Sequence, residues 1–505
     1  MQFKFSAKQF FSLPEPRVCP ILWSMLETSS ERPEAAGQMP VVAARQGASP
    51  WGDIVEVVIN ALKAISDVVW GPIMLVLLVG TGLYLTIGLR FFPFRNWMRS
   101  YACLWQGRSH QSADGEISPW NALMTALAGT IGTGSIVGVA TAISVGGPGA
   151  LFWMWVTAVV GMVTKFAEVM LSVHFRERTP AGNWVGGAMY FIKNGLGSRW
   201  AWMGALFCIF CMIACMGTGA MVQANAISAN LDTTFGIPVW VTALALLALA
   251  GTVIIGGVSR VGAVAGKLVP FMACLYCVLS LLVIGSHISE IPKVVWMIVS
   301  DAFTPAAAGG GFAGATVMMA IRQGMARGVF SNEAGLGTAP MAHAASTAHS
   351  PLTQASIGML DVFITTLIIC SMTGFAILVT GEWCSGVSGG IMTASAYEKA
   401  LPGIGRIGVT VCLALFAFTT ALGWCVYGER CAIYLFGDRA QLPFRIVYVL
   451  VFCLGALLSL EAVWLASDIG NALMAFPNLT GILLLSPFLF RLVREEAQKD
   501  PRFIV

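Results

Sequence analysis

The sequence predicts an all-α polytopic membrane protein of about eleven transmembrane helices, with two inverted five-helix repeats after one extra N-terminal helix. Hydrophobic residues make up 57% of the 505 residues and charged residues 11%, whereas a soluble domain carries roughly 25% charged residues. Apolar windows of about 20 residues, long enough to cross a bilayer, recur along the chain. Two of these windows are interrupted by glycines at corresponding places in the two halves. These observations exclude a soluble globular protein.

The predicted spans follow one another through polar or glycine-rich connections. Segment 289–303 is too short and too polar to span, so we expect it at the membrane interface. Residues 1–50 contain several prolines and charges but no long apolar run. This composition predicts a disordered extension without a secretory signal, or one that lies upstream of a true start at Met39. The apolar windows cover residues 68–89, 119–144, 149–173, 201–230, 238–257, 266–286, 310–342, 356–381, 405–434, 444–463 and 465–490.

The domain organisation follows from these windows, with the first span placed outside the two repeats. Its five parts are the N-terminal extension (1–50), a peripheral first helix with a cytoplasmic loop (51–117), the first five-helix repeat (118–289), the second repeat with an interfacial helix near 290–303 (290–490), and a cytoplasmic tail (491–505).

Basic residues gather in the connections on one predicted side of the membrane. Cytoplasmic loops carry an excess of Lys and Arg, so this side is predicted to be cytoplasmic. The C-terminus then lies in the cytoplasm and the N-terminus outside, in a multi-pass protein of the plasma or inner membrane. The basic residues are Arg90, Arg95, Arg99, Arg108, Arg176, Arg178, Lys193, Arg199, Arg260, Lys267, Arg430, Arg439, Arg445, Arg491, Arg494, Lys499 and Arg502.

Two predicted spans are broken in the middle. Irregular backbone at membrane depth survives only where it lines a protected cavity, and broken helices at matching positions of inverted halves are typical of LeuT-type transporters. Close helix packing is the alternative role for such glycines, and Gly134 and Gly138, four residues apart, also suit it. The first break holds Gly129, Gly132, Gly134 and Gly138 between Thr130, Thr133 and Ser135, and the second holds Gly324, Gly328, Gly335 and Gly337.

Two long motifs resemble those of the alanine or glycine:cation symporter family, the sodium:alanine symporters of bacteria and archaea. One is the run GGPGALFWMW from Gly146, which ends at Gly161, and the other is RGVFSNEAGLGTAP at 327–340, followed by Ala342-His343-Ala344. The resemblance extends from about residue 50 to the C-terminus. It implies a LeuT-type fold with one extra helix and sodium-driven uptake of a small neutral amino acid. Alanine is the first candidate, followed by glycine, serine and D-alanine. Na⁺ is then the coupling ion, and no other cofactor is expected.

A zwitterionic amino acid needs donors for its carboxylate, and the N-terminus of a half-helix offers free N–H groups with a positive dipole end. We therefore predict that the backbone amides of the first break bind the carboxylate of the substrate. Trp424 is predicted to close over a small side chain, or else to be an interfacial residue. Gln223 either bonds the substrate or joins helices. The candidate substrate residues are Thr130, Gly132, Thr133, Gly134, Ser135, Gln223, Thr420 and Trp424.

The resemblance to the LeuT fold also implies a sodium site between spans two and nine. Thr419 and Thr420 would supply hydroxyls, facing the carbonyls of Ala128 and Ile131, with a further carbonyl from Phe416. The alternative is that each threonine bonds a carbonyl of its own helix. Many family members carry Asn where this chain has Ser135, which leaves the number of coupled ions open.

Several ionisable residues lie within predicted spans, where charge is costly. Lys165 and Glu168, three residues apart on one helical face, are expected to pair with each other. Glu333 is expected either to relay protons or to cap the backbone or pair with a charge locally. His343 and His349 are expected to bind no metal.

Three other functional classes remain as alternatives. The nearest is a proton-coupled symporter of the same fold. A channel would need a filter loop, and a membrane enzyme would need a catalytic constellation, but neither pattern is present. The sequence also lacks a Walker motif, which argues against an ATP-driven pump, and its basic residues follow the membrane rather than a nucleic-acid surface. The oligomeric state stays open.

Overall fold

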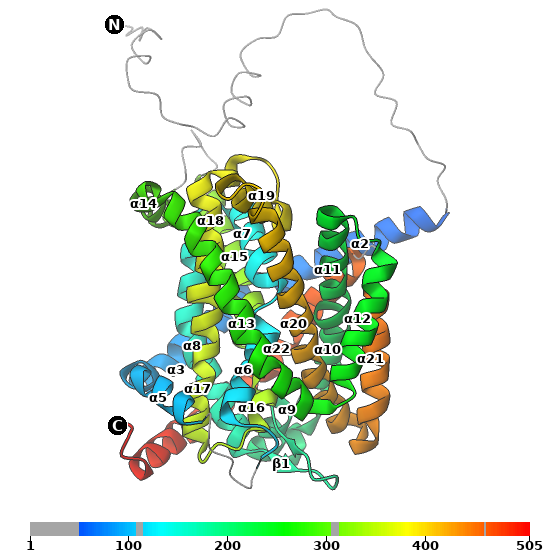
Figure 1. The fold of residues 1–505 in the computed structure, drawn as a ribbon. Helices are drawn as coiled ribbons and strands as arrows, with labels where there is room; N and C mark the ends of the chain where they lie inside the picture. Colours follow the sequence, from blue (N-terminus) through cyan, green and yellow to red (C-terminus); the bar gives the residue numbers. More distant parts are fainter. Residues whose placement is uncertain (1–49, 108–114, 305–312, 459–460, 505) are drawn as a thin grey trace, which may run out of the picture.

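A computed structural model describes residues 50–107, 115–304, 313–458 and 461–504. The chain forms one helical bundle, with a short antiparallel hairpin of β1 (Glu177–Arg178) and β2 (Trp184–Val185) at one end (Figure 1). The predicted extension lies outside the described residues except for Pro50, which begins a helix. Met39 also lies outside them.

The helices follow the predicted order of spans, with short helices between them. Before the first repeat come α2 (Pro50–Val69), α3 (Pro72–Gly88), α4 (Phe92–Arg95) and α5 (Trp97–Gln106). The segment predicted to be the first repeat contains α6 (Pro119–Thr130), α7 (Val139–Gly146), α8 (Gly149–His174), α9 (Ala188–Leu196), α10 (Ala201–Ala214), α11 (Val222–Phe235), α12 (Val239–Ile254) and α13 (Gly257–Ser286). The segment predicted to be the second repeat contains α14 (Ile291–Asp301), α15 (Ala313–Asn332), α16 (Ala339–Ala344), α17 (Pro351–Val362), α18 (Ser371–Thr380), α19 (Gly389–Ala400), α20 (Gly405–Phe436), α21 (Gln441–Gly455) and α22 (Glu461–Lys499).

Three segments of the chain form a π-helical turn, in which backbone hydrogen bonds join residues five apart instead of the four of an α-helix. These turns are Gly134–Gly138 before α7, Cys215–Met221 between α10 and α11, and Phe363–Cys370 between α17 and α18. Such π-bulges are rare and occur mostly at functional sites. The first two adjoin the cavity described below.

Seven helices of the described chain are long and apolar enough to cross a membrane, or eight if the bent pair α6 and α7 counts as one span. The other predicted spans correspond to α12, α15 and α21, which are shorter or less apolar. The protein is therefore a multi-pass membrane protein, while the count of about eleven crossings stays a prediction. Segment 289–303 contains the separate helix α14, which lies at one end of the bundle (Figure 1).

The first predicted break is confirmed. Helix α6 begins at Pro119 after the N-cap Ser118, whose side chain accepts from the Asn121 amide, and it ends at Thr130. At Ile131 the backbone leaves the helix, with φ −82° and ψ 82°. The chain resumes through the π-helical turn into α7, and the two halves are bent by 52°.

The second break lies between α15 and α16. Helix α15 ends at Asn332, and the chain then passes through left-handed conformations at Glu333 (φ 55°), Gly335 (φ 90°) and Gly337 (φ 79°). Glycine reaches this region without steric cost. Pro340 stands in the first turn of α16, where a missing N–H does no harm.

Gly324 and Gly328 were predicted to belong to this break, which is wrong. Both lie inside α15 and face α8. A Cβ at Gly324 would collide with the Ala150 carbonyl, and one at Gly328 would lie 3.4 Å from the Met154 Cα. Their role is close helix packing, which small residues allow in membranes.

Candidate functional site

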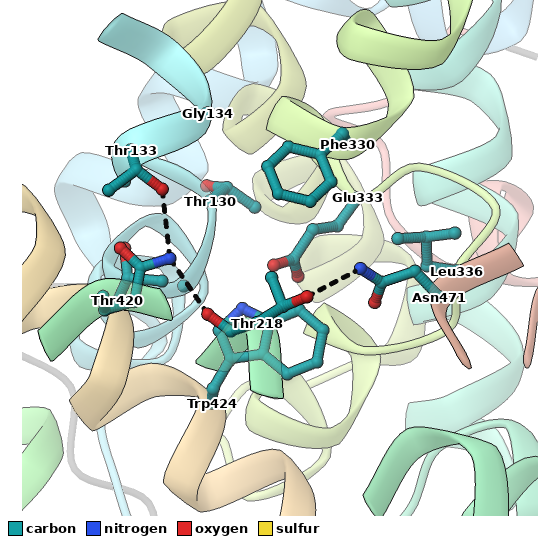
Figure 2. A pocket seen from close by; sticks show the side chains of 13 residues that line it. Thr130, Thr133, Gly134, Thr218, Phe330, Glu333, Leu336, Thr420, Trp424 and Asn471 are labelled. Atoms are coloured by element: carbon teal, nitrogen blue, oxygen red, sulfur yellow. Dashed lines mark hydrogen bonds between the residues drawn. The ribbon is translucent and has the colours of Figure 1, made fainter. Parts of the chain in front are cut away.

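A cavity lies where the two helix breaks meet (Figure 2). The space that the centre of a water molecule can occupy in this cavity is about 10 Å³. This is room for roughly one water. An amino acid therefore enters only if side chains of the lining move apart. The lining residues come from both breaks and the helix ends beside them, from the π-helical turn before α11, and from α11, α20 and α22. They are Gly129, Thr130, Gly132, Thr133, Gly134, Thr218, Gln223, Phe330, Glu333, Leu336, Thr420, Trp424 and Asn471.

All but one of the predicted substrate residues lie in this lining. Ser135 lies beside it: its hydroxyl is 3.1 Å from the Ser331 hydroxyl of α15. Its carbonyl accepts a hydrogen bond of 2.8 Å from the Thr373 hydroxyl of α18. Ser135 thus joins the first break to α15 and α18.

The first turn after the break presents backbone donors to the cavity. The amides of Gly132 and Ser135 donate to the carbonyls of Thr130 and Gly132, at 3.1 Å each. The first N–H groups of a helix have no acceptor within it, and those of Thr133 and Gly134 are the ones beside the cavity. This end of the cavity suits a carboxylate.

Gln223 both lines the cavity and joins two helices. Its side-chain amide donates to the Thr133 hydroxyl at 3.2 Å and to the Thr218 carbonyl at 3.0 Å. Its carbonyl oxygen is buried and has no partner among the described residues. The Thr218 hydroxyl accepts from Asn471 of α22 at 3.2 Å. These hydrogen bonds connect α11, α22 and the first break along one side of the cavity.

The predicted sodium residues divide into two groups. The Thr420 hydroxyl lies 3.4 Å from the Ile131 carbonyl, which the break frees. The Thr419 hydroxyl bonds the Phe416 carbonyl of its own helix at 3.0 Å and lies 3.3 Å from the sulfur of Met272. Ala128 is fully buried in α6. The structure thus brings Thr420 and the Ile131 carbonyl together. Thr419 instead bonds a carbonyl of its own helix, which was the alternative to a role in binding sodium.

Trp424 is buried, with 2% of its surface exposed, so it is not an interfacial residue. Its ring contacts Tyr427, with the ring centroids 5.8 Å apart. Gly219 of the π-helical turn packs against it, since a Cβ there would lie 2.5 Å from the Trp424 Cβ. The ring forms one wall of the cavity.

The expected pairing of Lys165 with Glu168 is wrong. Lys165 forms a fully buried ion pair with Asp361 of α17 at 3.3 Å, and the other oxygen of Asp361 accepts a bond of 2.6 Å from Thr130. Glu168 instead accepts from the amides of Gly335 (3.0 Å) and Gly337 (3.2 Å). The second break leaves these amides without helical acceptors, and Glu168 accepts from them.

Sequence reasoning missed Asp361 and Asn471. Asp361 is the single charged residue of the predicted span 356–381, and an acid inside a membrane span is a functional candidate by default. Asn471 carries the same signal as Gln223, a polar amide in an apolar helix. His343 is buried and bonds Gln354 at 2.6 Å. Among the described residues no cluster suitable for a metal of His, Cys, Asp and Glu ligands is found.

Two broken helices that meet at a cavity with polar lining residues, in a multi-pass bundle, define a secondary transporter of LeuT type. Among solved structures, MhsT in complex with L-phenylalanine matches with a TM-score of 0.53 at 12% identity, over 76% of this chain and 99% of that one. This match confirms the predicted fold class.

Residues 55–502 match the sodium:alanine symporter family. An uncharacterized transporter of Haemophilus influenzae is 47% identical over 427 residues, 84% of this chain and 93% of the relative. The sodium/alanine symporter AgcS of Methanococcus maripaludis is 41% identical over 434 residues, 85% of this chain and 95% of the relative. The chain belongs to the sodium:alanine symporter family and is a cation-coupled amino-acid symporter rather than an enzyme.

Proposed function

We propose that the protein imports alanine, or a similarly small neutral amino acid, together with Na⁺ by alternating access. The observation that supports this most is the position of Thr420. Its hydroxyl lies 3.4 Å from the freed Ile131 carbonyl, and the same side chain lines the cavity. A sodium ion held here would touch the wall of the substrate site, so that binding of one favours binding of the other.

The proposed sodium site comprises Thr420 and the Ile131 carbonyl at its centre. The carbonyls of Ala128 and Phe416 and the Thr419 hydroxyl complete it from the same turns of α6 and α20. Unwound carbonyls at a helix break coordinate Na⁺ in transporters of this architecture. The sodium/alanine symporter AgcS, whose name states its ion and substrate, supports the assignment.

The proposed substrate site places the carboxylate at the amides of Thr133 and Gly134, beside Gln223. Phe330, Leu336 and Trp424 are the large apolar side chains of the lining, and they limit the substrate to a small side chain. Since one methyl group is worth only about 0.8 kcal/mol in transfer terms, glycine, serine and D-alanine belong to the same candidate class.

The proposed direction is inward across the plasma or inner membrane. The positive-inside rule supports a cytoplasmic C-terminus and an external N-terminus. The hairpin β1–β2, which follows Arg176, and the end of α22 near Lys499 lie at the same end of the bundle (Figure 1). That end is the proposed cytoplasmic side.

A symporter driven by protons is the second candidate function, and the position of Glu333 favours it. This carboxylate lines the cavity and is 2% exposed. A buried acid in a transport pathway is a common proton carrier.

Uptake of labelled alanine into proteoliposomes tests the proposal. We expect uptake under an imposed Na⁺ gradient without a proton gradient, and none under the proton gradient alone. Uptake driven by protons without Na⁺ would keep the fold and move the coupling to Glu333. Folded protein that takes up no alanine under either gradient would contradict the substrate.

A further inference from the structure

Glu333 is a buried carboxylate at the start of the second helix break. It is the first residue after α15, and its left-handed backbone (φ 55°) is uncommon for a residue with a side chain. This conformation turns the side chain away from the path of α15. Figure 2 shows the carboxylate below the Phe330 ring and above Thr218 and Trp424, which also line the cavity.

Among the described residues this carboxylate is not found in an ion pair. Its Oε2 accepts a bond of 2.5 Å from the Thr338 hydroxyl. Lys165, the fully buried cation of α8, is paired with Asp361. A charge within a membrane bundle is costly unless it is paired, so a cationic group that enters the cavity would find a partner in Glu333.

The two breaks bring different polar groups to the cavity. The first break contributes backbone donors, namely the amides of Thr133 and Gly134. Glu333 belongs to the other broken helix and is the only acidic side chain of the lining. An amino-acid zwitterion has the complementary arrangement, with an acceptor carboxylate and a donor ammonium on one carbon.

We propose that Glu333 accepts the ammonium group of the substrate, so that a free α-amino group is the feature by which the site selects its substrate. This inference rests on the proposed function and adds to it. The substrate then bridges the two broken helices, one through its carboxylate and the other through its ammonium group. Molecules that lack the ammonium group, such as lactate and propionate, would leave the Glu333 charge unpaired in a buried site.

The first test compares ligands on the unchanged protein. In Na⁺-driven proteoliposomes, we expect unlabelled alanine to inhibit uptake of labelled alanine at least about 10-fold more strongly than L-lactate or propionate, because a hydrogen bond to a charged group is at stake. Equal inhibition by lactate would overturn the inference. This test does not depend on the folding of any variant.

The second test is the variant Glu333→Gln, which keeps the shape and removes the charge. We expect the KM for alanine to rise about 10- to 100-fold, with a smaller change in kcat. We also expect the difference between inhibition by alanine and inhibition by lactate to become smaller. Glu333→Asp is expected to recover part of the affinity. A purely structural role would lower kcat or the folded amount and leave the KM and the lactate ratio unchanged, which would contradict the proposal.

Glu429→Gln is the matched control, since this buried carboxylate pairs with Arg445 (2.6 Å) and does not line the cavity. Its KM for alanine should stay near that of the parent protein. The experiments distinguish a failure of the proposed transport function from a failure of the proposed role of Glu333. If the parent takes up no alanine, the proposed function fails. If the parent takes up alanine and Glu333→Gln keeps its KM, only the role of Glu333 fails.

Discussion

Thr419 and Thr420 are adjacent in the sequence, but their hydroxyls face different neighbours. Only the Thr420 hydroxyl approaches the Ile131 carbonyl, while the Thr419 hydroxyl is already bonded within its own helix. We therefore expect Thr420→Ala to raise the Na⁺ concentration for half-maximal uptake by about 10-fold or more, because a ligand of a charged group is lost. Thr419→Ala should have a smaller effect. Sodium titrations of alanine uptake check this order, and the reverse order would move the ion toward Thr419.

Gly219 and Gly138 differ in the space around them. A Cβ at Gly219 would fall 2.5 Å from the Trp424 Cβ, whereas one at Gly138 would meet no heavy atom within 4 Å. We expect Gly219→Ala to push Trp424 toward the cavity and to weaken uptake of alanine more than that of glycine. Gly138→Ala, the control, should leave the alanine-to-glycine ratio unchanged. An unchanged ratio in Gly219→Ala would show that Trp424 does not limit substrate size.

At the scale of elements, Glu168 of α8 holds the second break in place. It accepts from the amides of Gly335 and Gly337 and from Asn478 of α22 at 2.6 Å. Glu168→Ala would leave these buried donors without an acceptor and is expected to destabilise the protein by about 2–4 kcal/mol. Glu168→Gln keeps one acceptor oxygen and should be intermediate. Thermal unfolding in detergent measures the order, and equal melting temperatures would contradict this role.

The Lys165–Asp361 pair joins α8 to α17 behind the first break. Both side chains are fully buried, and removal of one partner of a buried pair typically costs about 3–5 kcal/mol. We expect Lys165→Met and Asp361→Asn each to lower the melting temperature strongly, and the double variant to recover part of the loss. Lys293→Met, in a largely exposed pair with Glu290, is the control and should change little. Strictly additive losses would show that the two charges do not interact.

The broken helices could be predicted because their glycines and threonines stand out in apolar runs, and most of the cavity lining lies next to them. The partners across the bundle could not. Lys165 and Glu168 share one helical face, and only the packing of α17 and of the second break decides which groups meet them. In the same way, Gly324 and Gly335 look alike in sequence. One packs against α8 and the other turns the chain, because only Gly335 has a left-handed backbone.

At the scale of the whole molecule, the bundle has two distinct ends. The hairpin β1–β2 lies at one end, and α14 and α19 lie at the other (Figure 1). We expect a cysteine at Arg178 in the hairpin to react with an impermeant maleimide only from the cytoplasm. A cysteine at Ser388, just before α19, should react only from outside. Labelling of intact cells and of inverted vesicles checks both, with the parent protein as the background, and the opposite pattern would reverse the proposed orientation.

The central claim is that Na⁺ and a small amino acid bind at adjoining sites where the two breaks meet. Calorimetric titration of alanine into the purified protein, with NaCl replaced stepwise by KCl, tests it most directly. Coupled sites typically change affinity by about 5- to 150-fold, so alanine should bind at least 10-fold more tightly at saturating Na⁺, and Thr420→Ala should remove most of this gain. Alanine affinity that is the same in NaCl and KCl would contradict the account.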